Sequence, residues 1–386
     1  MRVDPVLRVV HLAKYAPSRR GGIETVTREL LASMGKIPRV ELDCYCYDSA
    51  TSEEQISPST RVRRRRTTFT VGTTPVSLAM LRDYWSARRK VDIVHLHLPN
   101  PWSALLVAAL PTAAAIVVSM HATSTRRTVL RRWYTAVTNR VLRRANIIVV
   151  SAASNTTAFH LDSFRHKVTV VPFGLDPARF QVCSGQKASA IDHGRGRVLF
   201  VGRLVYYKGL DTLLAAAQHV DAEFMVVGDG PCYAKLYGTV QESGLAERVH
   251  FLGGLDDAGL IDQLHACTML VLPSSTISET FGMSVLEAMA FGKPVVVTSL
   301  GTGLDELVRT ADCGLIVPPN NPDALASALN DLLGSPRERD RFGANGRRAF
   351  EQRYTSGQMA KAILEIYDTV AGPARSVNTP NEMSMT

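Results

Sequence analysis

Twelve short apolar runs rich in β-branched residues recur along the 386-residue chain, and predicted helical segments separate them. Short runs of this kind are typical of strands buried in parallel sheets. Six lie in each half of the chain: LRVVHLA, VELDCYCY, VDIVHLHL, AAIVVSM, NIIVVSA and KVTVVPFG, then RVLFVGRL, EFMVVGDG, VHFLGG, MLVLPSS, KPVVVTS and GLIVPP. Two such series predict an α/β protein of two facing, doubly wound Rossmann-like domains with an interdomain cleft.

The chain is too long for one ordinary core, which also favours two domains. We expect one domain at residues 1–175 and a second at 176–352, with the change near VPFGLDPARF. Residues 353–371 are predicted to form a last helix, and residues 372–386 are predicted to be a disordered tail.

Composition favours a cytoplasmic protein. The six cysteines are scattered and lack metal-ligand spacing, which favours a reduced compartment. No signal peptide is evident at the N-terminus. The longest apolar stretch is broken by Pro111 and is short for a bilayer span, which needs roughly 20 residues.

Charge is divided unevenly between the halves. Residues 1–175 carry 26 Lys and Arg against 11 Asp and Glu, whereas residues 176–386 carry 18 against 24. A basic half is typical of proteins that meet a polyanion, either nucleic acid or anionic lipid. The arginines concentrate in two basic segments, residues 61–66 and residues 126–145. The second basic segment is predicted to be a helix, and it fits a core helix with a solvated charged face as well as it fits a surface-binding role. The candidate surface consists of Arg63, Arg64, Arg65, Arg66, Arg127, Arg131 and Trp133.

Two loops that follow predicted strands contain candidate phosphate-binding residues. Gly21 and Gly22 lack a Cβ, so the backbone there can approach a bound group closely, although many such loops carry glycines for turning only. Arg203 and Lys208 flank the start of a predicted helix, where two cations suit a pyrophosphate, although a pair of surface cations fits the spacing as well.

The segment SETFGMSVLEAMAFGKPV combines a predicted helix N-terminus with two carboxylates, Glu279 and Glu287. The N–H groups of Phe281, Gly282, Met283 and Ser284 suit an anion, whereas an ionised glutamate only accepts hydrogen bonds and suits hydroxyl groups. A nucleotide sugar presents both kinds of group. Glu287 also fits an ordinary glutamate near a helix start, which the helix dipole favours.

The chain resembles the retaining GT-B glycosyltransferases of family four over nearly its whole length. The resemblance rests on GGIE, VPFGLD, VGRLVYYKG, VVGDGP, HFLGGL, ETFGMSVLEAMAFGKPVV and GTGLDELV, in the family's order. It implies that Glu279 binds hydroxyl groups of the donor sugar and that Glu287 binds the ribose. It also implies that the base is recognised near Gly253 and Gly254, and that His121 lies near the anomeric centre.

The region around His121 is similar to bacterial polysaccharide mannosyl- and rhamnosyltransferases, although Ala-Thr follows the histidine here where Ser-Asp is common. The resemblance implies an acceptor-binding first domain, a donor-binding second domain and a last helix that crosses back to the first. The predicted function is hexose transfer from a nucleotide sugar, GDP-mannose or a related donor such as a UDP-hexose, to a saccharide or lipid-linked saccharide.

No D-x-D triplet occurs in the sequence, so catalysis by Arg203, Lys208, Glu279 and His121 is predicted to need no metal ion and no cofactor. Peripheral attachment to the inner face of an anionic cytoplasmic membrane is expected. Two other classes remain open. A nucleic-acid-binding protein would explain the basic half but not the residues that follow the strands of the acidic half. A phosphorylase-like enzyme would keep the cleft and use free phosphate as the acceptor.

Overall fold

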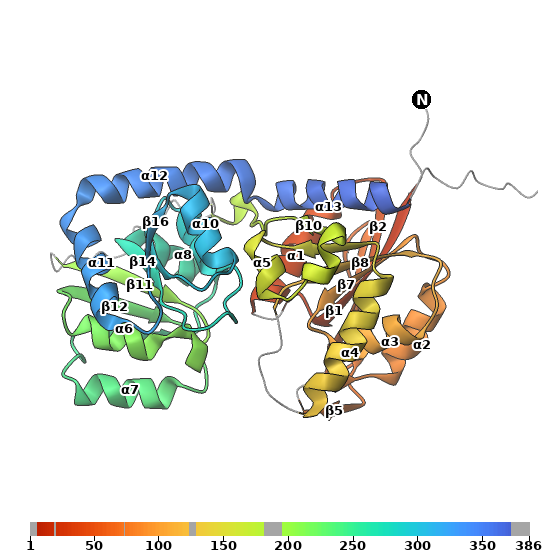
Figure 1. The fold of residues 1–386 in the computed structure, drawn as a ribbon, viewed down its shortest axis with the longest axis horizontal. Helices are drawn as coiled ribbons and strands as arrows, with labels where there is room; N and C mark the ends of the chain where they lie inside the picture. The colour runs from red at the N-terminus through yellow and green to blue at the C-terminus, as the bar shows by residue number, and fades with distance from the viewer. Residues whose placement is uncertain (1–5, 19–20, 73, 123–128, 181–194, 372–386) are drawn as a thin grey trace, which may run out of the picture.

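The computed structural model describes residues 6–18, 21–72, 74–122, 129–180 and 195–371. It has two lobes, each built around one mostly parallel sheet with helices packed against it (Figure 1). All twelve predicted strands are present. The first sheet ends with β10 and the second begins with β11, on either side of the predicted boundary between residues 175 and 176. The predicted tail at 372–386 lies outside the described residues.

The first sheet has the strand order β10-β9-β8-β7-β1-β2-β4-β3. Its strands are β1 (Leu7–Tyr15), β2 (Val40–Asp48), β3 (Ser52–Ser57), β4 (Thr60–Arg66), β7 (Ile93–Leu98), β8 (Ala115–Met120), β9 (Ile147–Val150) and β10 (Val168–Val170), and a separate hairpin is formed by β5 (Phe69–Val71) and β6 (Thr74–Val76). The order reverses between β1 and β7, and such a switch point opens a crevice at the carboxyl ends of the two strands.

The helices of this lobe are α1 (Gly22–Met34), α2 (Leu78–Ala87), α3 (Pro101–Ala109), α4 (Val129–Arg144) and α5 (Ser154–Ala158), with a 3₁₀ helix η1 (Asp162–Lys167). Successive side chains along each strand point to opposite faces of the sheet and pack in two separate hydrophobic cores. Val9 packs in the same core as Leu30 of α1, whereas Val10 packs in the same core as Met80 of α2 and Val107 of α3. Buried parallel strands of this kind are apolar on both faces.

The second sheet has the order β13-β12-β11-β14-β15-β16, which is the dinucleotide-binding order of two βαβαβ halves. Its strands are β11 (Gly196–Val201), β12 (Ala222–Val227), β13 (Val249–Gly253), β14 (Met269–Leu272), β15 (Val295–Thr298) and β16 (Gly314–Val317). Its helices are α6 (Leu210–Ala217), α7 (Tyr233–Glu242), α8 (Asp257–Ala266), α9 (Met283–Ala290), α10 (Gly303–Ala311) and α11 (Pro322–Gly334), with 3₁₀ helices η2 (Pro177–Phe180) and η3 (Tyr206–Lys208). The switch point lies between β11 and β14.

The last two helices, α12 (Pro336–Arg353) and α13 (Ser356–Ala371), run one after the other along one side of both lobes (Figure 1). The chain passes beside Leu175, which pairs with Thr355 in an isolated parallel bridge. Helix α13 then packs against α1, where Arg39 donates two hydrogen bonds of 2.8 and 2.6 Å to Asp368. The last helix therefore closes onto the first lobe.

Among the described residues, no helix is both long and apolar enough to span a bilayer.

Candidate active site at the seam between the sheets

The loops after β11 and β14 meet at the switch point of the second sheet. Lys208 ends η3 after β11, and its Nζ donates to Glu279 Oε2 at 2.5 Å. The Ser274 hydroxyl, directly after β14, donates to the same oxygen at 3.1 Å. Arg203 lies exposed in the first of these loops. The structure thus brings Lys208 and Glu279 together and leaves Arg203, five residues before Lys208, exposed to solvent.

Helix α9 (Met283–Ala290) begins close to this ion pair in the chain, with Gly282 as its N-cap. Gly282 has φ +82°, and a Cβ on it would lie 2.6 Å from Leu304 Cδ1, so both backbone conformation and space require glycine. No side chain caps the helix, whose first residues are Met283 and Ser284. Phe281 is buried just before it. The N-terminus of α9 therefore presents uncapped N–H groups next to Glu279, as a phosphate site requires.

Glu287, one turn into α9, has a partner that the sequence did not reveal. Arg179 Nη1 donates to Glu287 Oε1 at 3.3 Å, and the same guanidinium donates two 2.9 Å bonds to Asp257. Burial raises the pKa of Glu287, and the nearby Arg179 opposes that rise. Arg179 therefore stabilises the ionised form of Glu287, which accepts hydrogen bonds and which burial alone disfavours.

Of the glycines predicted near the donor, Gly22 lies at this seam. A Cβ on Gly22 would be 3.8 Å from Met283 Cγ, so α1 of the first lobe begins against α9 of the second. Gly21 precedes it as the N-cap of α1. Gly253 ends β13 with φ +65°, and Gly254 follows it exposed. Gly22 and Gly254 are exposed, so the backbone is accessible at these two positions.

His121 follows β8, at the carboxyl edge of the first sheet, and the second lobe contacts it directly. The Thr280 hydroxyl donates to the His121 carbonyl at 2.7 Å, so the main chain of His121 contacts the residue that follows Glu279. The His121 ring stacks on Phe173, with ring centres 5.3 Å apart, and Phe173 meets Phe281 edge-on. Burial lowers the pKa of His121 to about 4, so its ring is neutral at pH 7.

Asn155 of α5 joins both lobes at the same seam. Its side chain donates to the Thr280 carbonyl at 3.1 Å and accepts from the Gly303 N–H at 3.0 Å. The carboxylate of Glu306 in turn accepts from two N–H groups at the start of α5. The two lobes are therefore connected by hydrogen bonds immediately beside Glu279.

The basic run at 63–66 is not the free cationic surface that the sequence suggested. It forms β4, whose antiparallel partner β3 carries Glu53 and Glu54. Arg63 pairs with Asp43 and Glu53, Arg64 pairs with Glu54, and Arg65 is buried against Asp83 and Glu53. Arg66 ends the strand exposed. Placing Arg65 on the surface was therefore wrong, because the edge hairpin supplies carboxylates opposite the arginines.

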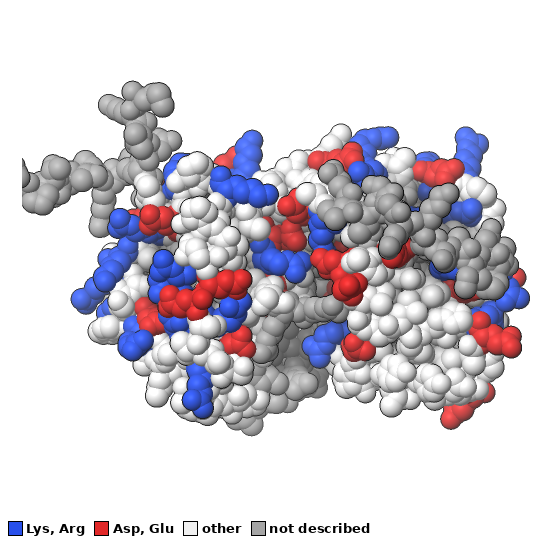
Figure 2. Space-filling model, turned by 180° about the vertical axis from the view of Figure 1, so that it is seen from behind, with Lys and Arg blue, Asp and Glu red and all other residues white. Residues whose placement is uncertain are grey.

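The second basic segment also has structural contacts. Arg140 and Arg144 donate to main-chain carbonyls at the end of α3, a usual role for cations at a helix C-terminus. Trp133 is exposed. Arg127 lies outside the described residues, as does the side chain of Arg131. Figure 2 shows acidic and basic side chains side by side on the first lobe, and a hollow between the lobes.

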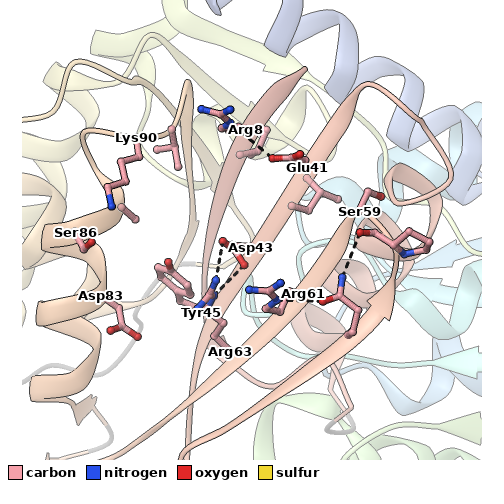
Figure 3. Close-up of a pocket in the computed structure, with 16 residues that line it drawn as sticks. Arg8, Glu41, Asp43, Tyr45, Ser59, Arg61, Arg63, Asp83, Ser86 and Lys90 are labelled. Carbon is pink, nitrogen blue, oxygen red and sulfur yellow. Dashed lines mark hydrogen bonds and ion pairs between the residues drawn. The ribbon is translucent and has the colours of Figure 1, made fainter. Parts of the chain in front are cut away.

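A separate hollow of about 510 Å³ lies between β2, β4 and α2 (Figure 3). Arg8 pairs there with Glu41, and Arg63 with Asp43. Arg8 and Glu41 stand in the first halves of their strands, away from the carboxyl edge that bears His121. This hollow is therefore separate from the seam site.

Sequence reasoning missed Arg179, Asn155 and Thr280. Arg179 lies in VPFGLDPARF, the segment at the predicted domain boundary, where a cation between the two domains was a visible signal. Asn155 and Thr280 are ordinary polar residues in sequence, and only the contact between the lobes makes them notable.

Two family models match the chain. "Glycosyl transferases group 1" matches residues 185–349, and "Glycosyltransferase Family 4" matches residues 20–179. The chain is 31% identical over 373 residues to O-antigen chain mannosyltransferase C of Escherichia coli, covering 94% of this chain and 99% of that protein. It is 31% identical over 360 residues to D-rhamnosyltransferase WbpZ of Pseudomonas aeruginosa, covering 91% of this chain and 93% of that protein.

Among solved structures, sucrose-phosphate synthase from Thermosynechococcus elongatus superposes with a TM-score of 0.78 at 21% identity, covering 94% of this chain and 98% of that chain. This likeness shows the arrangement of the two sheets as a GT-B fold.

Proposed function

The chain belongs to the family 4 glycosyltransferases of GT-B fold, and we propose that it transfers mannose or a related hexose from GDP-mannose to a lipid-linked saccharide. The proposed transfer retains the configuration of the anomeric carbon and serves bacterial polysaccharide or glycolipid synthesis. Glycosyl transfer follows from the family. Mannose is supported by the names of the relatives, a mannosyltransferase and a D-rhamnosyltransferase. The observation that carries the proposal is the Lys208–Glu279 pair beside the uncapped start of α9.

In this proposal the donor rearranges the charges of the second lobe. The Lys208 ammonium leaves Glu279 for the diphosphate, Arg203 closes on the same phosphates, and the N–H groups of residues 281–284 face them. Glu279 is then released to accept from hydroxyl groups of the sugar, and Glu287 accepts from the ribose. The base lies near residues 253–254, and residues 21–22 cover the phosphates from the first lobe.

The reaction proposed for this site breaks the bond between the anomeric carbon and the diphosphate oxygen. The electron pair leaves with the phosphate, and an acceptor hydroxyl attacks the same face while passing its proton to the departing phosphate oxygen. His121, which is neutral and whose carbonyl accepts from Thr280, the residue after Glu279, is proposed to lie near that carbon. Arg203 and Lys208 stabilise the negative charge that develops on the diphosphate, so the step is proposed to need no metal ion.

We also propose that the first lobe attaches to a membrane, through an apolar patch on α2 rather than through the arginines at 63–66. Leu78 and Trp85 of α2 are 59% and 51% exposed and, with Leu81 and Leu110, line a shallow apolar hollow. Phe69 of the nearby hairpin is exposed as well. Arg82 lines the same hollow. An apolar patch beside a cation is typical of shallow insertion into an anionic interface.

Cosedimentation with phosphatidylglycerol vesicles tests this surface. Changing Leu78 and Trp85 together to Ser is expected to lower partitioning by about tenfold or more, because each side chain contributes about 1.5–3 kcal/mol when fully buried. The matched control changes exposed Tyr237 of α7 to Ser, and it should bind as the wild type does. Equal loss in both variants, or binding that ignores the patch, would contradict the proposal.

Donor identity is tested by thermal unfolding with GDP, UDP, ADP and dTDP and their sugars. GDP-mannose is expected to raise the melting temperature most, because a ligand that binds only the folded state stabilises it by mass action. A larger rise with a UDP-hexose would replace GDP-mannose by the alternative donor. No rise with any of them would contradict a nucleotide-sugar site.

A further inference from the structure

Glu287 has one carboxylate oxygen that is held and one that is open. Its side chain is 11% exposed, and Arg179 Nη1 donates to Oε1 at 3.3 Å. Oε2 has no hydrogen-bond partner among the described residues, and it is not one of the polar atoms that are closed off from solvent without a partner. A largely buried carboxylate with one open oxygen has a free acceptor for a hydroxyl group that enters the site.

Arg179 is held in place by a partner other than Glu287. It lies in η2, just after the boundary between the lobes, and its Nε and Nη2 donate to the two carboxylate oxygens of Asp257 at 2.9 Å each. A contact at two points fixes the plane of the guanidinium, and the remaining nitrogen, Nη1, then reaches Glu287. The position of this cation is therefore set by a contact outside the Glu287 site.

The charge of Glu287 depends on groups from three neighbouring elements. Burial raises its pKa most, and Arg179 of η2 is the largest influence that opposes the rise. Asp257 of α8 raises the pKa further, whereas Arg28 of α1 lowers it. Arg28 is itself paired with Glu29, at 3.5 Å. Removing Arg179 therefore moves the titration of Glu287 to higher pH, and removing the charge of Asp257 moves it the other way.

We propose that Arg179 is a positioning residue that makes the site selective for ribonucleotides. It holds Oε1 and leaves Oε2 of an ionised Glu287 to accept from the ribose hydroxyls. Donors built on 2′-deoxyribose, such as dTDP-sugars, then bind weakly. This inference rests on the proposed function, in which Glu287 accepts from the ribose, and it narrows the donor to a ribonucleoside diphosphate sugar.

The 2′-hydroxyl is the group that the two classes of donor do not share. A ribonucleotide offers adjacent 2′- and 3′-hydroxyls, and one carboxylate oxygen has lone pairs for both. A 2′-deoxyribonucleotide leaves part of this acceptor without a donor in a site that water reaches poorly. A site built to bind a hydroxyl group rejects the analogue that lacks it, because the polar group of the protein is left unpaired.

This preference depends on pH through Glu287. The ionised carboxylate is the stronger acceptor, so selectivity is present above the pKa of Glu287 and is lost as the pH falls through it. Arg179→Met raises that pKa, and selectivity is then lost at a higher pH than in the wild type. A role of Arg179 in folding alone would weaken the binding of ribo- and deoxyribonucleotides equally and would leave their ratio unchanged.

Isothermal titration calorimetry of the full-length protein tests the selectivity, with GDP against 2′-deoxy-GDP and with UDP against 2′-deoxy-UDP, between about pH 6 and about pH 8.5. With the base that binds, the wild type is expected to prefer the ribonucleotide by about tenfold or more at the upper end of this range. In Arg179→Met the ratio is expected to fall to within about threefold of unity at neutral pH and to rise as the pH increases.

Asp257→Asn is the matched control, because it changes the other partner of Arg179 and leaves the cation beside Glu287. It should keep the wild-type ratio, with a pH dependence that is unchanged or moved to lower pH. If Arg179→Met is unfolded at the assay temperature, Glu287→Gln takes its place. The ratio in that variant should lie within about threefold of unity at every pH, since the side chain no longer carries a charge.

Three results would overturn this inference and leave the proposed function standing. They are equal affinity of the wild type for the ribo and deoxy forms, a wild-type ratio and pH dependence in the variant that carries the test, and equal loss of selectivity in Asp257→Asn. Failure of both GDP and UDP to bind the wild type would instead contradict the nucleotide-sugar site itself, and the inference would fail together with the proposed function.

Discussion

Removing the Arg179 side-chain charge is expected to leave Glu287 as an unpaired carboxylate in a buried site. The Arg179 side chain is 15% exposed and that of Glu287 is 11% exposed, so water replaces little of the lost interaction. Arg179→Met keeps most of the apolar stem while removing the guanidinium. The second partner of Arg179, Asp257, is 61% exposed and is hydrated without it.

The expected loss of stability is about 2–4 kcal/mol at neutral pH. Breaking a fully buried ion pair costs roughly 3–5 kcal/mol, and residual exposure reduces that figure, whereas the exposed contact with Asp257 contributes at most about 1 kcal/mol. Burial already raises the pKa of Glu287, and losing Arg179 raises it further. A carboxyl group whose pKa is raised by folding makes the folded state less stable as pH rises toward that pKa. The stability that Arg179→Met loses relative to the wild type is therefore small near pH 4 and grows toward neutral pH.

Thermal unfolding of Arg179→Met against pH, in the wild-type and Glu287→Gln backgrounds, measures this effect. The deficit should nearly vanish in the Glu287→Gln background, where no charge is left unpaired. Arg165→Met, which removes an exposed partner of Asp162, is the matched control and should cost less than about 1 kcal/mol. A deficit that is independent of pH and equal in both backgrounds would refute the reasoning.

Three further predictions concern the same seam. Gly282→Ala should lower the melting temperature and donor affinity more than Gly301→Ala, because both have positive φ but only the first would meet a side chain within 4 Å; equal effects would contradict the steric argument. Asn155→Ala should destabilise the protein by about 1–3 kcal/mol through orphaned buried groups, compared by thermal unfolding with the exposed control Asn330→Ala, and a loss no larger than the control's would count against it. Transfer should survive EDTA in a coupled assay of nucleotide release, and activity lost on chelation and restored by Mg²⁺ would show that the diphosphate site was misread.

The fold and part of the candidate site could be predicted from the sequence. Parallel strands bury both faces, so their apolar runs were recognisable, and the positions of Lys208 and Glu279 just after predicted strands assigned both to one donor site. The hydrogen bond between them was not predicted. The four strands that were not predicted, β3 to β6, are polar or short. Glu53 and Arg63 in particular form a cross-strand pair that is visible only once the register of the hairpin is known.

The contacts among the buried histidines of the first sheet could not be predicted for the same reason. His95 and His97 are alternate residues of one strand, which indicates a shared face, but their contacts with His11 depend on the register between β1 and β7. Tyr367 joins them only because α13 returns to the first lobe. Arg179 and Asn155 act across large sequence separations, so their partners emerge from packing rather than from any local pattern.

Radiolabelled hexose transfer from GDP-mannose to a lipid-linked saccharide, measured for the wild type and for Lys208→Ala, tests the central claim most directly. Removing the ammonium that stabilises the departing diphosphate should lower kcat by about 10² or more. Lys235→Ala, which removes an exposed lysine paired with Asp211 in the same lobe, should transfer at the wild-type rate. Transfer by Lys208→Ala at the wild-type rate would contradict the assignment of the donor site to the seam.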